Sequence, residues 1–174
     1  MKRYICPALV ILTILGGTFS GCGGPVGVSR PQTMTEVVKL FYGDASNETI
    51  VAEERHISYR QGEDKYALIL QKLIAGPENK NHRANISPET KVYGTIRQNN
   101  ALIVDLSREF NHFAGSMAEI IGVGTVVNTL TQFETIDKVK LLVEGEELLS
   151  PGGMPRGFME AFLLPLYSRM WRPT

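Results

Sequence analysis

The sequence predicts an α+β fold in which one mixed or antiparallel sheet of four to five strands has two helices packed on one face. Three observations support this: two stretches with helical apolar spacing, a clear hairpin pattern between them, and β-branched runs near both ends. The elements follow the order strand, optional second strand, helix, strand, strand, helix, strand. The chain of 174 residues has room for one domain with a genuine core.

The first strand is predicted at residues 37–42, where β-branched and aromatic residues end at a Gly-Asp turn signal. Residues 49–57 predict a second, more polar strand whose charges suit a sheet edge. Glu53 and Glu54 are interpreted as such edge charges. Neighbouring strand residues face opposite sides, so these two do not form a carboxylate pair.

The first helix is predicted from an apolar stripe with i, i+3, i+4, i+7 spacing that runs from Tyr66 to Ile74. Asp64 is available as its N-cap, because a carboxylate there accepts a hydrogen bond from a free backbone N–H. Gly76 and Pro77 follow, and this pair ends a helix.

Residues 91–106 predict a hairpin whose turn lies at residues 99–100, because asparagine tolerates the positive φ of tight turns. The second arm, residues 101–106, is apolar on both faces until Asp105, which predicts a central place in the sheet. The last strand is predicted at residues 139–145.

The second helix is predicted at residues 116–133 and is apolar enough to lie against a sheet with little exposure. Ser116 and Glu119 have the spacing of a capping box. Gly122 and Gly124 cost helix propensity, about 1 kcal/mol each relative to alanine. We expect close approach to a strand to offset this cost.

The N-terminus has the pattern of a bacterial export signal. Two cations at residues 2–3 precede an apolar run over residues 5–15, which is shorter than the roughly 20 residues a membrane span needs. Residues 19–22, Phe-Ser-Gly-Cys, resemble the lipobox of bacterial lipoproteins. We therefore expect cleavage before Cys22 and a diacylglyceryl group on its thiol. An ordinary signal peptide cut elsewhere and an uncleaved short anchor are the alternatives.

These patterns divide the chain into four parts. Residues 1–21 are predicted to be a lipoprotein signal peptide, and residues 22–35, rich in Gly, Pro and Ser, a flexible tether. Residues 36–148 form the predicted domain. Residues 149–174 form an apolar tail.

The tail combines aromatic, methionine and arginine side chains, a composition enriched at protein interfaces. Its candidate partner contacts are Arg156, Phe158, Phe162, Tyr167 and Trp171. Three interpretations stay open: the tail folds back on the core with Pro165 breaking any long helix, it forms a contact surface for a partner, or it dips into lipid headgroups.

The sequence shows no recognisable catalytic, cofactor or metal constellation. Eighteen basic residues balance 18 acidic ones without a basic run, which argues against nucleic acid as a partner. The GxGxxV run at residues 122–127 lies inside a predicted helix and lacks the third glycine of a dinucleotide loop. Asp105 is expected to bond the backbone at Ser107 or to pair with Arg108. The three histidines, His56, His82 and His112, are scattered without metal-ligand spacing. His82 is expected to be exposed to solvent.

Three segments together resemble the GerM-type sporulation and spore-germination domain (GerMN): "LQKLIAGPEN", "SPETKVYGTIRQNNALIVDLSREF" and "GSMAEIIGVGTVVNTLTQFETIDKVKLLVEGEE". The resemblance covers residues 36–148. It implies a fold similar to the ring-building modules of the channel that joins mother cell and forespore, and a Gram-positive, endospore-forming type of host. It carries over no catalytic residues. Family members often have two such domains in tandem, whereas this chain has room for one.

The function expected from these features is that of a non-catalytic envelope scaffold on the outer face of the cell membrane, anchored by a lipid on Cys22. Its expected partners are other envelope or sporulation-channel proteins, and copies of itself. A small ligand-binding lipoprotein, for example one for a cell-wall fragment, is the alternative. A third hypothesis is an enzyme whose site is built from Asp105, Glu53 and His56.

Overall fold

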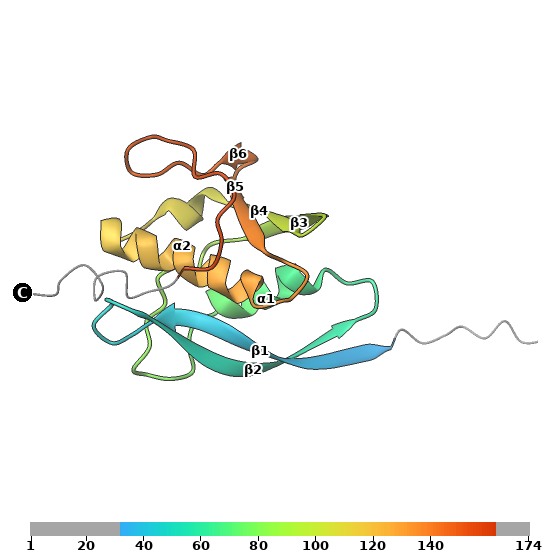
Figure 1. Cartoon of the computed structure of the whole chain (residues 1–174). Coiled ribbons are helices and arrows are strands. Elements are labelled where there is room, and N and C mark those ends of the chain that lie inside the picture. The colour runs from blue at the N-terminus through green and yellow to red at the C-terminus, as the bar shows by residue number, and fades with distance from the viewer. Residues whose placement is uncertain (1–31, 163–174) are drawn as a thin grey trace, which may run out of the picture. The chain divides into compact units, whose positions relative to one another are not determined.

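The computed structural model describes residues 32–162, and its α+β architecture confirms the predicted class (Figure 1). The elements in chain order are β1 (Thr33–Gly43), β2 (Ile50–Arg60), α1 (Lys65–Ile74), β3 (Val92–Gln98), β4 (Ala101–Leu106), the 3₁₀ helix η1 (Arg108–Asn111), α2 (Ser116–Thr131), β5 (Lys138–Val143) and β6 (Glu146–Glu147). Each predicted helix and strand corresponds to one of these elements, with ends that differ by a few residues.

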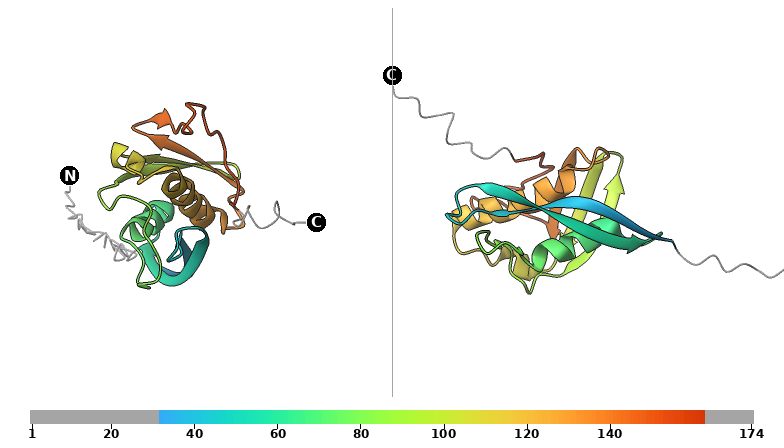
Figure 2. Two further views of the ribbon diagram at one scale, coloured as in Figure 1. Left: turned by 90° about the vertical axis from the view of Figure 1, so that its left-hand side faces the viewer. Right: turned by 90° about the horizontal axis from the view of Figure 1, so that it is seen from below.

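The strands form two sheets where the sequence predicted one. β1 and β2 pair as an antiparallel hairpin of their own, and the second sheet has the order β3-β4-β5-β6, with β4 and β5 parallel. The two helices lie between the hairpin and this second sheet (Figures 1 and 2). Side-chain alternation tells which face of a strand is buried but not which sheet the strand joins. The separate hairpin is therefore not readable from the pattern.

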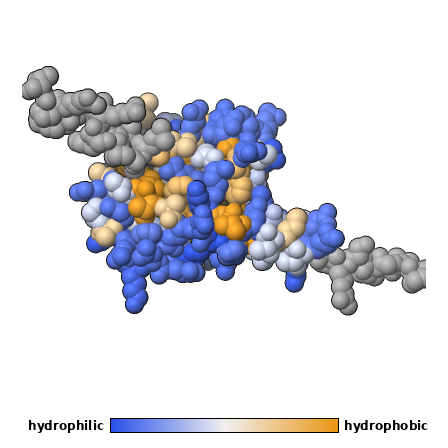
Figure 3. All heavy atoms as spheres, turned by 60° about the horizontal axis from the view of Figure 1, so that its bottom comes forward, coloured by the Kyte–Doolittle hydropathy of each residue, from blue (hydrophilic) through white to orange (hydrophobic). Residues whose placement is uncertain are grey.

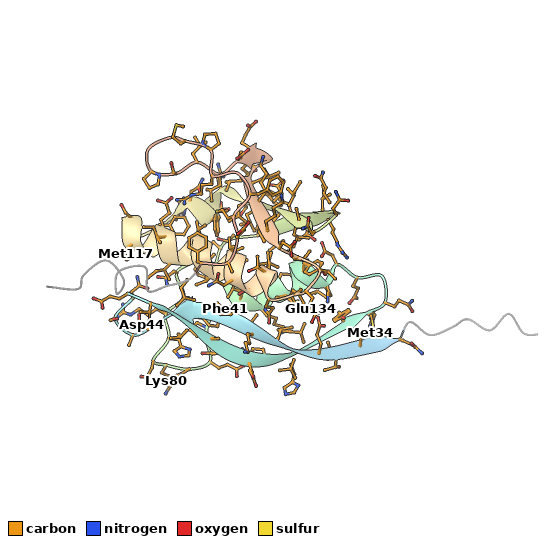
Figure 4. The ribbon with its side chains drawn as sticks, viewed as in Figure 1. Met34, Phe41, Asp44, Lys80, Met117 and Glu134 are labelled. Atoms are coloured by element: carbon orange, nitrogen blue, oxygen red, sulfur yellow. The ribbon has the colours of Figure 1, made fainter. Side chains whose placement is uncertain are left out.

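Figure 4 shows Asp44 at one end of the hairpin and Met34 near the other. The turn is built around the Asp44 carboxylate, whose Oδ1 accepts hydrogen bonds from the backbone N–H of Glu48 (2.8 Å) and Thr49 (3.1 Å). The hydroxyl of Ser46 donates to Oδ2 at 2.6 Å. These hydrogen bonds hold the pKa of Asp44 well below its usual range and fix the register of the long hairpin.

The core lies on both sides of the helices. Leu40 and Tyr42 reach it from the hairpin, while Leu102 and Val104 reach it from β4. Burial raises the pKa of the Tyr42 phenol to about 12, and its hydroxyl donates to the carbonyl of Gly76 at 3.0 Å. β4 lies between β3 and β5, which confirms its predicted central position.

The predicted N-cap of α1 is confirmed, because Oδ1 of Asp64 accepts the backbone N–H of Ala67 at 3.0 Å. The same carboxylate accepts the N–H of Thr95 at 3.2 Å and its hydroxyl at 2.9 Å. The Asp64 carboxylate therefore caps α1 and also accepts hydrogen bonds from Thr95 in the edge strand β3. The predicted hairpin turn is also confirmed, with Asn99 at φ 54°.

The predicted capping box of α2 is wrong. The N-cap is Gly115, at φ 112°, and no side chain caps the helix. Ser116 is already the first helical residue, so its hydroxyl is not at the position from which it would accept an N–H. The carboxylate of Glu119 pairs instead with the guanidinium of Arg156, which lies 37 residues further along the chain.

The two glycines of α2 lie where neighbouring groups approach the helix closely. A Cβ on Gly122 would lie 2.6 Å from the ring of Phe113 and 3.0 Å from the carbonyl oxygen of Asn85. A Cβ on Gly124 would lie 2.8 Å from Cδ1 of Ile50, in β2. The expected close approach is present, but side chains and a loop make it rather than the backbone of a strand.

Candidate interaction surfaces

Residues 155–162 of the predicted tail pack on the domain. Met159 and Val139 exchange two backbone hydrogen bonds, at 2.7 and 2.8 Å, so this segment extends the edge of β5. Further along, the side-chain amide of Asn128 binds the backbone of Phe162 at both its N–H and its carbonyl. The first of the three interpretations of the tail therefore describes this part of it.

The predicted partner contacts differ in their surroundings. The Arg156 side chain, 15% exposed, forms an ion pair with Glu119. Phe158 is 42% exposed, and its ring centroid lies 5.1 Å from Nζ of Lys138 and 5.5 Å from Nζ of Lys140. Among the contact candidates within residues 32–162, only Phe158 is an exposed large hydrophobic residue. Three predicted residues lie outside the described part of the chain: Cys22, Tyr167 and Trp171.

The face of β3, β4 and β5 that points away from the helices is here named the outer sheet face. Two of its cross-strand rows are Ile96–Ile103–Lys140 and Gly94–Asp105–Leu142. Residues of the opposite face, such as Val104 and Leu141, are almost completely buried. Ile96 on the outer face is 61% exposed. The outer face thus exposes an apolar side chain on its edge strand β3, while Asp105 and Lys140 place charges on its central strands.

A hollow of about 260 Å³ lies on the β3 side of the outer sheet face. Its lining includes Tyr93, Gly94, Ile96, Ile103, Asp105 and Leu142. Gly94 contributes no side chain, and the register of β3 shifts beside it, between Val92 and Gly94. A missing side chain and a bulge together open a shallow depression in a pleated surface.

Asp105 contributes the carboxylate of this hollow. Its Oδ1 accepts the backbone N–H of Gly145 at 3.0 Å. The expected partners, the backbone at Ser107 or the side chain of Arg108, are therefore wrong, because the turn after β5 supplies a backbone N–H to this carboxylate.

Glu53 lies in β2, which is an edge strand of the two-stranded sheet as the sequence predicted, but its carboxylate does not face open solvent. Its side chain is only 10% exposed and accepts hydrogen bonds from both sides. The backbone N–H groups of Glu78 and Asn79 donate to it at 3.1 and 3.0 Å. Arg55 donates at 2.5 Å and His82 at 2.8 Å. We name these contacts the Glu53 clasp, which fastens the loop after α1 to the hairpin.

The clasp changes the surroundings of two ionisable groups. Burial alone would raise the pKa of Glu53, but the hydrogen bonds from Arg55 and the loop outweigh it and lower the pKa to about 2. The side chain of His82 is 14% exposed, so the expectation that this histidine is solvated is wrong. Its partner Glu53 lies 29 positions away in the chain, which no local sequence pattern reveals.

A second hollow, of about 390 Å³, lies between α2 and the β6 region, with Glu119, Glu147 and Ser150 in its lining. Two of its three carboxylates, all except that of Glu146, are engaged in ion pairs. Glu119 pairs with Arg156, and Glu147 pairs with Lys140 at 2.5 Å.

Figure 3, which shows the hairpin side, has separate hydrophobic areas within a largely hydrophilic surface.

The structure does not bring the dispersed acids and histidine together. Glu53 is held in its clasp, His56 is exposed on the hairpin, and Asp105 belongs to the other sheet. Within residues 32–162, no group of three or more His, Cys, Asp or Glu side chains is placed to hold a metal ion. No helix in the same range has the length and apolar character to cross a membrane.

These features define an α+β domain in which several half-buried charges are paired with one another, as in the Glu53–Arg55 and Glu119–Arg156 ion pairs. The profile of the Germane family, described as sporulation and spore germination, matches residues 39–149. The chain belongs to this family. It is 32% identical over 131 residues to the spore germination protein GerM of Bacillus subtilis, a match that covers 71% of this chain and 35% of GerM. The chain thus spans about a third of the length of that relative.

Solved structures agree with this assignment. The first GerMN domain of Bacillus subtilis GerM is 29% identical with a TM-score of 0.59, covering 72% of this chain and 97% of that domain. The tandem GerMN domains of the same protein match with 28% identity and a TM-score of 0.58, covering 73% of this chain and 46% of theirs. A candidate lipoprotein from Clostridium perfringens shares the fold, at 20% identity and a TM-score of 0.51, over 75% of this chain and 87% of that one.

Proposed function

We propose that this protein is a membrane-anchored, non-catalytic scaffold of the cell envelope that acts in sporulation or spore germination by binding other envelope proteins. The observation that carries the proposal is the family membership of residues 39–149, whose matched relatives are named for these processes. A single GerMN-like domain on a lipid anchor places one protein-binding surface beside the membrane.

The state of the ionisable groups supports a role without catalysis. A catalytic acid or base is commonly recognised by a perturbed pKa in an open cleft. Glu53, which has such a perturbed pKa, uses its carboxylate to bind Arg55, His82 and a loop backbone. Its lowered pKa is thus explained by structural hydrogen bonds.

The anchor rests on the leader and on Cys22. Each buried CH₂ of a lipid contributes about 0.8 kcal/mol, so the two chains of a diacylglyceryl group hold a protein firmly whereas one chain is marginal. With the tether of residues 22–35, the domain would lie just outside the membrane, in reach of other envelope proteins.

A Cys22→Ala variant tests the anchor. The wild-type chain is expected in the membrane fraction of the producing cells and the variant in the soluble or secreted fraction. A Ser20→Ala variant, which keeps the cysteine, serves as the matched control and should stay with the membrane. Equal retention of the Cys22→Ala variant contradicts the anchor.

The ligand-binding alternative has one specific observation in its favour, the hollow of about 390 Å³ beside β6. A ligand that binds the folded state must raise the melting temperature. A thermal-shift series with muropeptides distinguishes the two proposals: the scaffold predicts no shift, and a concentration-dependent rise favours the ligand-binding protein.

A further inference from the structure

Two apolar side chains lie exposed near the N-terminal end of α2. Met117 is 50% exposed and Ile120 is 38% exposed, although the helix is buried from Ile121 to Leu130. Figure 4 shows Met117 at one end of the helix. Met117, Ile120 and Gly124 have the i, i+3, i+7 spacing that places residues on one side of a helix. We name the exposed side chains of Met117 and Ile120 the α2 patch.

The described part of the C-terminal segment ends beside this patch. Arg156, Met159 and Phe162 bind the domain in turn, through an ion pair, a backbone bridge and the amide of Asn128. A Cβ on Gly124 would lie 3.3 Å from the ring of Phe162. The chain therefore leaves the described domain against α2, about one helical turn from the α2 patch.

The residues that follow Phe162 have the length and the composition to cover the α2 patch. Along the helix axis Met117 lies about 10 Å from Gly124, at 1.5 Å per residue. An extended chain covers about 3.3 Å per residue, so roughly four residues reach that far. The large apolar side chains of residues 163–174 are Leu163, Leu164, Leu166, Tyr167, Met170 and Trp171.

From this arrangement we infer that residues 163–174 dock on the α2 patch of their own chain and cover Met117 and Ile120. A segment whose attachment point lies beside its binding surface has an effective concentration on the order of millimolar. A partner protein or a lipid must exceed this concentration to occupy the same surface. The predicted contact residues Tyr167 and Trp171 then contact α2.

This inference goes beyond the proposed function and does not rest on it, because the contact is made within one chain. Its consequence is that this side of α2 is not a binding surface for other envelope proteins in the intact chain. Loss of the anchor in Cys22→Ala would leave the contact intact. Conversely, a chain that stays on the membrane with an uncovered α2 patch would overturn this inference alone.

Photo-crosslinking of the full chain tests the contact directly. A benzophenone amino acid in place of Met117 should, on irradiation, form an adduct with residues 163–174. In a mixture of ¹⁵N-labelled and unlabelled chains, the crosslinked peptide pair should be entirely labelled or entirely unlabelled, because both peptides come from one chain. The same probe at Val37, which is 55% exposed on the hairpin, is the matched control and should give little of this adduct.

Methionine oxidation provides a second measurement, because peroxide oxidises methionine according to its exposure. In a chain that ends at Phe162, the oxidation rate of Met117 should rise about threefold or more relative to the full chain. Met34, 41% exposed, and Met154, 69% exposed, are internal references whose rates should not change. A cooperative urea transition shows whether the shortened chain is folded, and the crosslink in the full chain stays decisive if it is not.

The outcomes separate the possible occupants of the α2 patch. An adduct within one chain between position 117 and residues 163–174 supports the inference. An adduct with lipid, with another protein or with a second copy would overturn it, as would the absence of any adduct with residues 163–174. An unchanged oxidation rate of Met117 in a folded, shortened chain would overturn it as well.

Discussion

The side-chain amide of Asn128 forms two hydrogen bonds with the backbone of Phe162. Its Nδ2 donates to the Phe162 carbonyl at 3.0 Å, and its Oδ1 accepts the Phe162 N–H at 2.6 Å. Gln132, one turn further along α2, binds the backbone of Lys39 in β1 in the same way, at 2.7 and 2.8 Å. Two amides of one helix thus satisfy backbone groups of the hairpin on one side and of the C-terminal segment on the other.

Replacement of Asn128 by alanine should release the segment around Phe162. Asn128 is 9% exposed, so the variant loses two part-buried hydrogen bonds, and we expect a loss of about 2 kcal/mol in the free energy of unfolding. Urea unfolding measures this loss, and amide hydrogen exchange at Phe162 should accelerate. Thr131→Ala, whose hydroxyl bonds only the Val127 carbonyl of its own helix, should change both far less. An unchanged exchange rate at Phe162 in the Asn128 variant would contradict the assigned role.

Alanine at the two glycines of α2 should give different results. At Gly122 the new Cβ meets an aromatic ring and a backbone carbonyl, neither of which yields easily, so we expect overpacking to cost about 2 kcal/mol. At Gly124 the nearest atom is the end of the flexible Ile50 side chain, at 2.8 Å, and the Phe162 ring follows at 3.3 Å; both are side chains that can move by a few tenths of an ångström, so the gain of about 1 kcal/mol in helix propensity offsets more of the cost there. Thermal unfolding of both variants shows which of the two is less stable. A Gly124→Ala variant less stable than Gly122→Ala would refute this account.

The Glu53 clasp should make stability depend on acid. The pKa of Glu53 falls from its ordinary value of 4.5 to about 2 on folding, so the folded state favours the charged carboxylate. Its contribution is complete above pH 4.5 and declines as the pH falls towards 2. Glu53→Gln should lower the free energy of unfolding at neutral pH by about 2–3 kcal/mol, a difference that shrinks over this range.

Urea midpoints of both chains between pH 7 and pH 2 measure this effect. The neighbouring exposed carboxylate offers the matched variant, Glu54→Gln, which should show a small difference at every pH. A difference between wild type and Glu53→Gln that stays constant down to pH 2 would show that the carboxylate charge does not stabilise the loop.

Sequence patterns predicted what depends on neighbours along the chain. The Asp64 cap, the Asn99 turn and the central position of β4 follow from residues within a few positions of each other. Contacts between distant segments were not predictable. Glu119 was assigned to a local cap because its ion pair with Arg156 spans 37 residues.

The candidate site was less predictable than the fold. Phe158 stood out by composition, but its position beside β5 depends on the Met159 bridge, which no local pattern announces. Asn128 was missed altogether. Its one signal was a polar residue in an otherwise apolar helix, which in a buried setting requires a hydrogen-bonding partner.

The central claim is that a lipid on Cys22 holds this family member at the membrane, where its surface binds other proteins. Mass spectrometry of the mature N-terminal peptide tests it most directly. The account predicts that the peptide begins at Cys22 and carries the mass of a diacylglyceryl group on the thiol. A secreted chain whose mature N-terminus lies elsewhere, or begins with an unmodified cysteine, would contradict it.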